Sequence, residues 1–171
     1  MKNIFLCGFM GCGKTTVGQA LAEKLGMTFI DMDRQIENTQ GESVSDIFKN
    51  HGEAYFRALE TKTAKELSLM NGVVVATGGG AVMSSENVEA FKSGGIVVLI
   101  DVPVEVIALR LHDDTTRPLL KKPDKNEVMR SLYLERMPIY RSAADFTVSN
   151  SDNRACQLIA DEILEKAKGS L

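Results

Sequence analysis

The stretch GFMGCGKT at residues 8–15 fits the pattern G-x-x-x-x-G-K-[ST], which forms a loop that binds phosphate groups. It follows an apolar run at residues 3–7, and it precedes a segment in which Val17, Leu21 and Leu25 recur on one helical face. A strand, a glycine-rich turn and a helix in this order are the context that the loop requires. The stretch therefore predicts an α/β fold whose first loop holds the phosphates of a nucleotide.

The residue types in this loop each suit phosphate binding. Glycines at positions 8, 11 and 13 allow backbone N–H groups to turn toward phosphate oxygens, and the following helix adds its positive N-terminal end. Lys14 supplies a cation for the outer phosphates, and Thr15 supplies a hydroxyl for Mg²⁺. A tight turn that merely needs glycine explains neither the lysine nor the hydroxyl.

Outward from the loop, short apolar runs alternate with segments of helical period, which is typical of a parallel sheet covered by helices on both faces. The predicted strands are residues 3–7, 28–31, 73–76, 96–100 and 146–148. We predict one domain over residues 1–171, with a helical insertion at about 33–70 that binds substrate. A polar segment at about 112–123, with little apolar content, predicts an exposed, mobile lid.

Composition narrows the class of protein. The 171 residues carry a formal net charge of −3 and a pI near 5.5, so no overall basic field attracts nucleic acid or acidic lipid. Three cysteines without metal-binding spacing indicate reduced thiols. No apolar run approaches the roughly 20 residues of a membrane span. We expect a cytoplasmic monomer whose partner is a small molecule rather than a nucleic acid or a membrane.

Two carboxylates follow the second predicted strand, at the sheet edge where parallel sheets bind ligands. If Asp31 and Asp33 both remain extended, their side chains share one face, where one serves Mg²⁺ and the other a substrate hydroxyl. Alternatively, Asp33 only caps the next helix. Since the third strand ends in Thr77 and glycines without an acid, the carboxylate for the metal is expected from Asp31.

Two further motifs suit a small anionic substrate. Glu60 lies three residues beyond Arg57 and is able to hold its guanidinium, and an anchored arginine suits capture of a carboxylate. Taken alone, this pair is more often an ordinary surface ion pair. The glycines at 78, 79 and 80 expose bare backbone, which permits close approach of a ligand, although a simple turn also explains each of them.

Together, these motifs resemble the shikimate kinase family. The resemblance rests on the phosphate loop, DMD at 31–33, FRALE at 56–60, TGGG at 77–80, Arg117-Pro118-Leu119 and LERMPIYRSAAD at 134–145, in order along nearly the whole chain. The phosphate loop alone is widely shared, but the set at these spacings is far more specific. It implies a nucleoside-monophosphate-kinase-like fold with sheet order 2-3-1-4-5.

The resemblance also implies an activity and a set of site residues. ATP with Mg²⁺ would phosphorylate the 3-hydroxyl of shikimate, in the pathway to chorismate and aromatic amino acids. The implied catalytic residues are Lys14, Asp33 and the lid arginine Arg117. The implied ATP-binding residues are Gly11, Cys12, Gly13, Lys14, Thr15, Thr16, Arg110, Arg117 and Arg154, with Thr15 and Asp31 at the metal. The implied substrate-binding residues are Asp33, Arg57, Gly78, Gly79, Gly80 and Arg136, with the two arginines on the carboxylate.

Two other functions remain open from the sequence. One is a kinase on the same fold that phosphorylates gluconate, a nucleoside monophosphate or another small acceptor. The other is a nucleotide-dependent switch, since a phosphate loop does not by itself guarantee transfer. Against the switch, no Asn-Lys-x-Asp motif selects guanine, and a polar loop with one arginine suits covering phosphates during transfer.

Overall fold

Five apolar runs form one parallel sheet in the order β2-β3-β1-β4-β5. The computed structural model describes residues 2–112, 124–151 and 154–169. Its strands are β1 (Asn3–Cys7), β2 (Thr28–Asp31), β3 (Val73–Ala76), β4 (Gly95–Asp101) and β5 (Phe146–Ser149). The sheet order and the α/β architecture predicted through the family resemblance are confirmed.

The three central strands, β3, β1 and β4, are the ones with almost continuously apolar sequences. Ile4 of β1 lies in register with Val74 on one side and Ile96 on the other. Every residue of β1 and β3 is buried, because helices cover both faces of the sheet. At the edges, β2 and β5 are only partly buried, which explains their weaker apolar signal.

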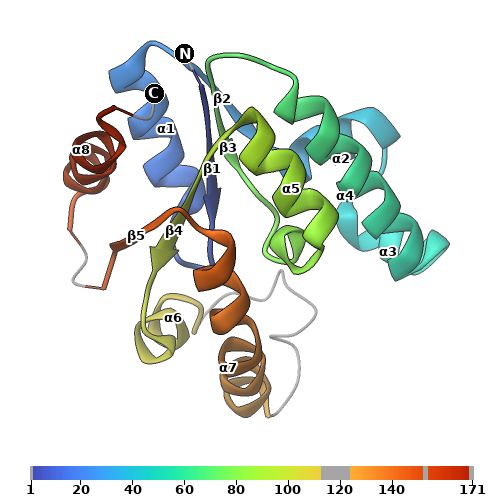
Figure 1. Cartoon of the computed structure of the whole chain (residues 1–171). Helices are drawn as coiled ribbons and strands as arrows, with labels where there is room; N and C mark the ends of the chain where they lie inside the picture. Colours follow the sequence, from blue (N-terminus) through green and yellow to red (C-terminus); the bar gives the residue numbers. More distant parts are fainter. Residues whose placement is uncertain (1, 113–123, 152–153, 170–171) are drawn as a thin grey trace.

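Helices lie on both faces of the sheet (Figure 1). Along one face run α1 (Lys14–Leu25) and α8 (Cys156–Ala167), which contact each other; α4 (Glu53–Ser68) and α5 (Ser85–Gly94) cover the other. Beyond the carboxyl ends of the strands lie α6 (Val104–Arg110) and α7 (Lys125–Ala143). These two helices therefore border the sheet edge at which the sequence predicts a site.

The segment between β2 and β3 consists of α2 (Met32–Gln40), α3 (Val44–His51) and α4. Ile36, Ile47 and Phe56 form a separate apolar cluster among these helices. A short 3₁₀ turn, η1 (Ala81–Met83), follows the glycines after β3. Of the lid predicted at about 112–123, residues 113–123 lie outside the described residues. Within the described part of the chain, no helix has the length and apolar character needed to cross a membrane.

At the end of the sheet remote from the predicted site, a buried asparagine joins three segments. The Asn3 amide nitrogen donates to Met70 O at 2.6 Å, and its side-chain oxygen accepts from Val73 N at 3.2 Å. Asn3 thereby ties the start of β1 to the connection between α4 and β3. A buried polar side chain of this kind stabilises the fold because its partners would otherwise lose their hydrogen bonds.

We expect Asn3→Ala to lower the free energy of unfolding by about 1–3 kcal/mol, because it leaves the buried N–H of Val73 without this acceptor and the Met70 carbonyl without this donor. Urea denaturation measures the change. The matched control is Asn38→Ala, an exposed position within α2, which should shift stability by no more than about 0.5 kcal/mol. Equal effects of the two variants would contradict the role of Asn3.

Candidate functional site

The loop between β1 and α1 has the backbone that phosphate binding needs. Gly8, Gly11 and Gly13 have φ values of +143°, +73° and +98°, a region that favours glycine. Gly13 caps α1 with no side-chain hydrogen bond, so the N–H groups of the first helical turn are not occupied by a capping side chain. A helix N-terminus of this kind attracts anions.

Lys14 lies across this loop. Its ammonium donates to Gly8 O at 2.8 Å and to Phe9 O at 3.2 Å. Lys14 also lines a cavity of about 310 Å³ together with residues from the ends of β2 and β3. The cavity residues are Met10, Gly11, Gly13, Lys14, Thr15, Thr16, Asp31, Asp33, Ala76, Thr77 and Gly79. We call it the phosphate cavity.

Thr15 and Asp31 meet on one wall of the phosphate cavity. The Thr15 hydroxyl donates to Asp31 Oδ2 at 3.1 Å. Adjacent oxygens around an octahedral Mg²⁺ lie about 3.0 Å apart, given metal–oxygen distances near 2.1 Å. The pair thus fits Mg²⁺, which commonly binds through one or two protein oxygens, substrate phosphates and water.

The arrangement of Asp31 and Asp33 differs from both predicted alternatives. The chain becomes helical at Met32, so the two aspartates do not share an extended strand. Asp31, not Asp33, caps α2, because its Oδ1 accepts from Arg34 N at 3.3 Å. Asp33 instead lies in the first turn of α2, and both carboxylates still line the phosphate cavity.

The glycine run after β3 allows side chains from the helical insertion to approach the sheet edge. A Cβ atom at position 78 would lie 2.8 Å from Asp33 Oδ1 and 3.0 Å from Glu60 Oε1. At position 80, a Cβ atom would lie 2.5 Å from Nη1 of Arg57. Gly80 has an ordinary φ of −99°, so its lack of a side chain matters for space rather than for backbone conformation.

Arg57 and Glu60 form an anchored ion pair, as their spacing predicted. Arg57 Nη1 donates to Glu60 Oε2 at 2.9 Å, and Glu60 is 1% exposed. A second carboxylate, Glu53, accepts from the other side of the guanidinium at 3.2 and 3.3 Å. We did not predict Glu53, although its position four residues before Arg57 is a signal for such a pair.

The pKa shifts of this pair follow from burial and from opposite charge. Burial raises the pKa of the Glu60 carboxyl above its ordinary value, while the Arg57 guanidinium acts in the other direction. For Arg57, burial acts to lower the pKa, but the carboxylates of Glu60 and Glu53 outweigh it and raise the pKa. Arg57 therefore stays cationic at neutral pH. Within the described residues, Glu60 Oε1 is buried without a hydrogen-bond partner.

Arg57 faces Arg136 across a second cavity, of about 370 Å³, which Gly80 also lines. Arg136 comes from α7, and its Nη1 lies 3.5 Å from Gly79 O. The same carbonyl accepts a hydrogen bond from the Tyr140 hydroxyl. We call this space the acceptor cavity, because two arginines from different helices converge on it.

A third cavity, of about 300 Å³, adjoins the phosphate loop on the side of α8. Arg110, Asn150 and Arg154 line it together with residues of the loop. Arg110 donates to Gly11 O at 3.3 Å and to Asn150 O at 2.6 Å. The Asn150 amide in turn donates to Cys12 O at 2.8 Å. The predicted nucleotide residues at 110 and 154 thus lie beside the phosphate loop, and Asn150 is an addition that no motif indicated.

Another predicted residue, Arg117, lies outside the described residues. The other predicted residues line the three cavities, except for Cys12, which is buried within the phosphate loop, and Gly78, which lies beside the carboxylates of Asp33 and Glu60. Sequence motifs separated by more than 100 residues, such as the phosphate loop and Arg136, are therefore brought to one edge of the sheet.

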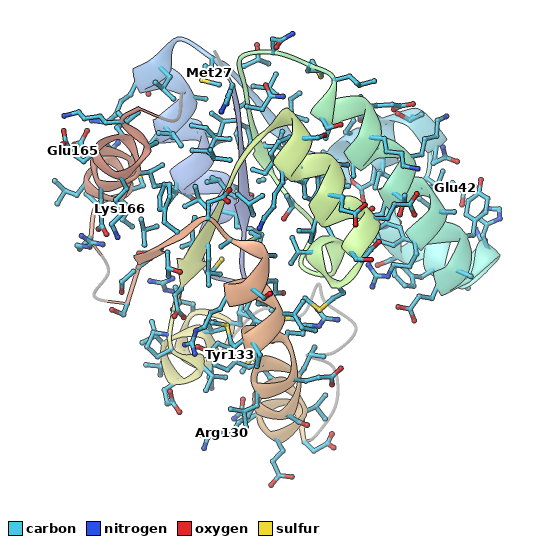
Figure 2. The ribbon with its side chains drawn as sticks, viewed as in Figure 1. Met27, Glu42, Arg130, Tyr133, Glu165 and Lys166 are labelled. Atoms are coloured by element: carbon cyan, nitrogen blue, oxygen red, sulfur yellow. The ribbon has the colours of Figure 1, made fainter. Side chains whose placement is uncertain are left out.

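A wider groove of about 640 Å³ lies elsewhere, between α6, α7, β5 and α8. Arg130, Tyr133 and Lys166 are among its residues (Figure 2). Its charges pair with one another: Arg130 with Glu105 at 3.1 Å and Lys166 with Glu162 at 3.0 Å. Because it includes no residue of the phosphate loop, its greater volume does not make it the candidate site.

Comparison with known proteins gives a consistent result. A model of the shikimate kinase family matches residues 10–168. The shikimate kinase of Sulfurihydrogenibium sp. (strain YO3AOP1) is 45% identical over 168 residues, which cover 98% of this chain and 99% of that protein. The shikimate kinase of Persephonella marina is 42% identical over 168 residues, covering 98% of this chain and 100% of that protein.

Solved structures agree with these relatives. A shikimate kinase from Acinetobacter baumannii in complex with shikimate superposes with a TM-score of 0.92 at 40% identity, covering 98% of this chain and 93% of that one. The shikimate kinase from Aquifex aeolicus superposes with a TM-score of 0.84 at 40% identity, covering 98% and 96% of the two chains.

Proposed function

The chain belongs to the shikimate kinase family, and from this premise we propose that it transfers the terminal phosphoryl group of ATP to the 3-hydroxyl of shikimate. The matches to these relatives cover nearly the full length of both proteins, and one similar solved structure is a complex with shikimate. The product, shikimate 3-phosphate, leads to chorismate and the aromatic amino acids.

One observation carries the proposal: the phosphate cavity and the acceptor cavity share the glycine run after β3. Gly79 lines the first and Gly80 lines the second. Asp33 reaches this boundary from α2, beside Gly78. A phosphoryl donor and a small carboxylate-bearing acceptor would therefore meet across a single stretch of backbone, with a carboxylate at the meeting point.

On the acceptor side, we propose that Arg57 and Arg136 bind the carboxylate of shikimate. Two guanidinium groups from α4 and α7 face the same cavity, and their planar N–H groups match a carboxylate. Glu60 and Glu53 hold the Arg57 side chain in place before substrate arrives. This fixed geometry reduces the ordering that binding would otherwise require.

At the boundary, we propose that Asp33 accepts or orients the proton of the reacting hydroxyl. A carboxylate placed at the acceptor oxygen assists proton removal as the new phosphorus–oxygen bond forms. On the donor side, the ammonium of Lys14 and the N-terminus of α1 stabilise the negative charge that the transferred group carries. A side chain at Gly78 would overlap the carboxylates of Asp33 and Glu60, so the glycine leaves room for these two groups.

Thr15 and Asp31 would hold Mg²⁺, which would supply positive charge beside the phosphate groups of ATP. These two residues are suited to it because their oxygens already lie 3.1 Å apart on the wall of the phosphate cavity. We further propose that Arg110 and Arg154 border the adenine, since both line the cavity beside the phosphate loop.

We also propose that the enzyme acts as a monomer in the cytoplasm. The described residues of a single chain supply the walls of all three cavities. The thiol of Cys7 is buried, and burial raises its pKa to about 12, so it stays protonated and unreactive. Free thiols of this kind are normal in a reducing compartment.

The proposed reaction is tested by measuring ADP release with ATP and Mg²⁺ over a panel of acceptors: shikimate, gluconate and nucleoside monophosphates. We expect turnover with shikimate and little with the others, because a pair of arginines selects a carboxylate at fixed distance from the hydroxyl. Lys14→Ala should abolish turnover while the far-ultraviolet circular dichroism stays unchanged. Preference for another acceptor, or normal turnover by Lys14→Ala, would falsify the assignment.

Asp33→Asn keeps the size of the side chain and removes its charge. We expect kcat to fall by about 10²–10⁴-fold with ATP binding largely unchanged, because the variant no longer accepts or orients the hydroxyl proton. Steady-state kinetics and ATP titration separate the two quantities. A normal kcat would rule out this role for Asp33.

Gly80→Ala adds one methyl group at a position whose φ any residue adopts. That methyl would overlap the Arg57 guanidinium, so we expect it to displace Arg57 and to raise the KM for shikimate by about 10- to 100-fold. The KM for ATP serves as the internal control and should change little. An unchanged KM for shikimate would show that Arg57 does not hold the carboxylate.

A further inference from the structure

Tyr140 is a fully buried tyrosine that lies among proposed site residues but lines none of the three cavities. It follows Arg136 by four residues on α7, so the two side chains lie one turn apart on the same face of the helix. Its hydroxyl donates to the carbonyl oxygen of Gly79. Tyr140 therefore connects α7 to the glycine run that separates the two cavities.

The carbonyl oxygen that accepts from Tyr140 has a second donor. A carbonyl oxygen carries two lone pairs. Nη1 of Arg136 also donates to Gly79 O, at 3.5 Å, so the phenol and the guanidinium meet at one atom. The Tyr140 hydroxyl and the Arg136 guanidinium are thereby neighbours, and each of them contacts the same carbonyl.

Burial fixes the direction of these hydrogen bonds. Burial raises the pKa of the Tyr140 hydroxyl far above its ordinary value, and Arg136 only partly offsets the rise. The hydroxyl therefore keeps its proton at any pH at which the enzyme works, and it remains a donor to Gly79. A phenylalanine would fill the same space without needing polar partners, so the buried hydroxyl serves a purpose other than packing.

We infer that Tyr140 is a positioning residue, which sets the Arg136 guanidinium for binding of the acceptor through the Gly79 carbonyl that both side chains contact. The inference rests on the proposed function, because it assumes that Arg136 binds the carboxylate of shikimate. Without the hydroxyl, Arg136 loses a neighbour that restricts its rotamer, and the Gly79 carbonyl loses its buried donor. Acceptor binding should weaken, while the phosphate loop, to which the Tyr140 hydroxyl makes no hydrogen bond within the described residues, keeps its function.

The first test is Tyr140→Phe, which removes one oxygen and keeps the ring. We expect the KM for shikimate to rise roughly 3- to 30-fold, as for the loss of one hydrogen bond near a charged group, with kcat and the KM for ATP changed by less than about 2-fold. A purely structural role would lower thermal stability without this selective rise. An unchanged KM for shikimate, or an equal rise for both substrates, would overturn the inference.

Tyr133→Phe is the matched control. Tyr133 lies two turns earlier on α7, on the side that meets α6 (Figure 2), and its hydroxyl donates to Asp101 Oδ1 at 3.4 Å. It lines the 640 Å³ groove rather than the phosphate or acceptor cavity. This variant also loses a tyrosine hydroxyl from α7, yet the KM for shikimate should stay within about 2-fold of the original. A rise equal to that of Tyr140→Phe would mean that general loosening of α7 is responsible, and would overturn the inference.

A double-mutant cycle tests whether Tyr140 acts through Arg136. We expect Arg136→Lys alone to raise the KM for shikimate, and Tyr140→Phe in that background to add much less than it does alone. Multiplicative effects would reject the coupling. The unmodified enzyme distinguishes failure of the proposed function from failure of this inference. If it does not phosphorylate shikimate, the proposed function is rejected. If its turnover of shikimate depends on Arg136 but not on Tyr140, only this inference is rejected.

Discussion

The site depends on a steric constraint: the chain carries no side chains at 78 and 80, where the backbone leaves β3. Any Cβ there would occupy the space of the Asp33 carboxylate, the Glu60 carboxylate or the Arg57 guanidinium. These charged groups come from α2 and α4, which share with α3 an apolar cluster that is separate from the main core. The missing side chains let groups from a separate helical layer reach the edge of the sheet, where the phosphate loop also lies.

Charge is arranged so that the arginines are fixed before any ligand binds. Glu60 is almost completely buried, a position that would be unfavourable for a lone carboxylate, and Arg57 compensates it through a direct hydrogen bond. The carbonyl oxygen of Gly79 has a similar role for Arg136, because it accepts hydrogen bonds from both Arg136 and Tyr140. Each cation of the acceptor cavity is therefore held by a group that belongs to the fold.

Much of this fold could be predicted from the sequence, because buried parallel strands are continuous apolar runs and the phosphate loop has a fixed pattern. The Arg57–Glu60 pair was also predictable, since helical spacing alone brings the two together. The path of the chain after Asp31 could not be predicted. Two aspartates one residue apart suit an extended strand as well as a helix start, and the choice depends on the hydrogen bond from Arg34 N to Asp31. The contacts of Tyr140 and Asn150 depend on tertiary packing between distant segments, so no local pattern reveals them.

The shared wall between the two cavities also has a consequence for ligand design. Gly79 and Gly80 are adjacent in the chain, yet one lines the phosphate cavity and the other the acceptor cavity. A compound that joins a carboxylate-bearing ring to a polyphosphate needs only a short linker to occupy both. Its second half would then bind at a high effective concentration, so a stiff bisubstrate compound should gain affinity that neither fragment has. Enzymes with a phosphate loop but no neighbouring arginine pair would lack the second anchor, which makes the spacing across this wall a basis for selectivity.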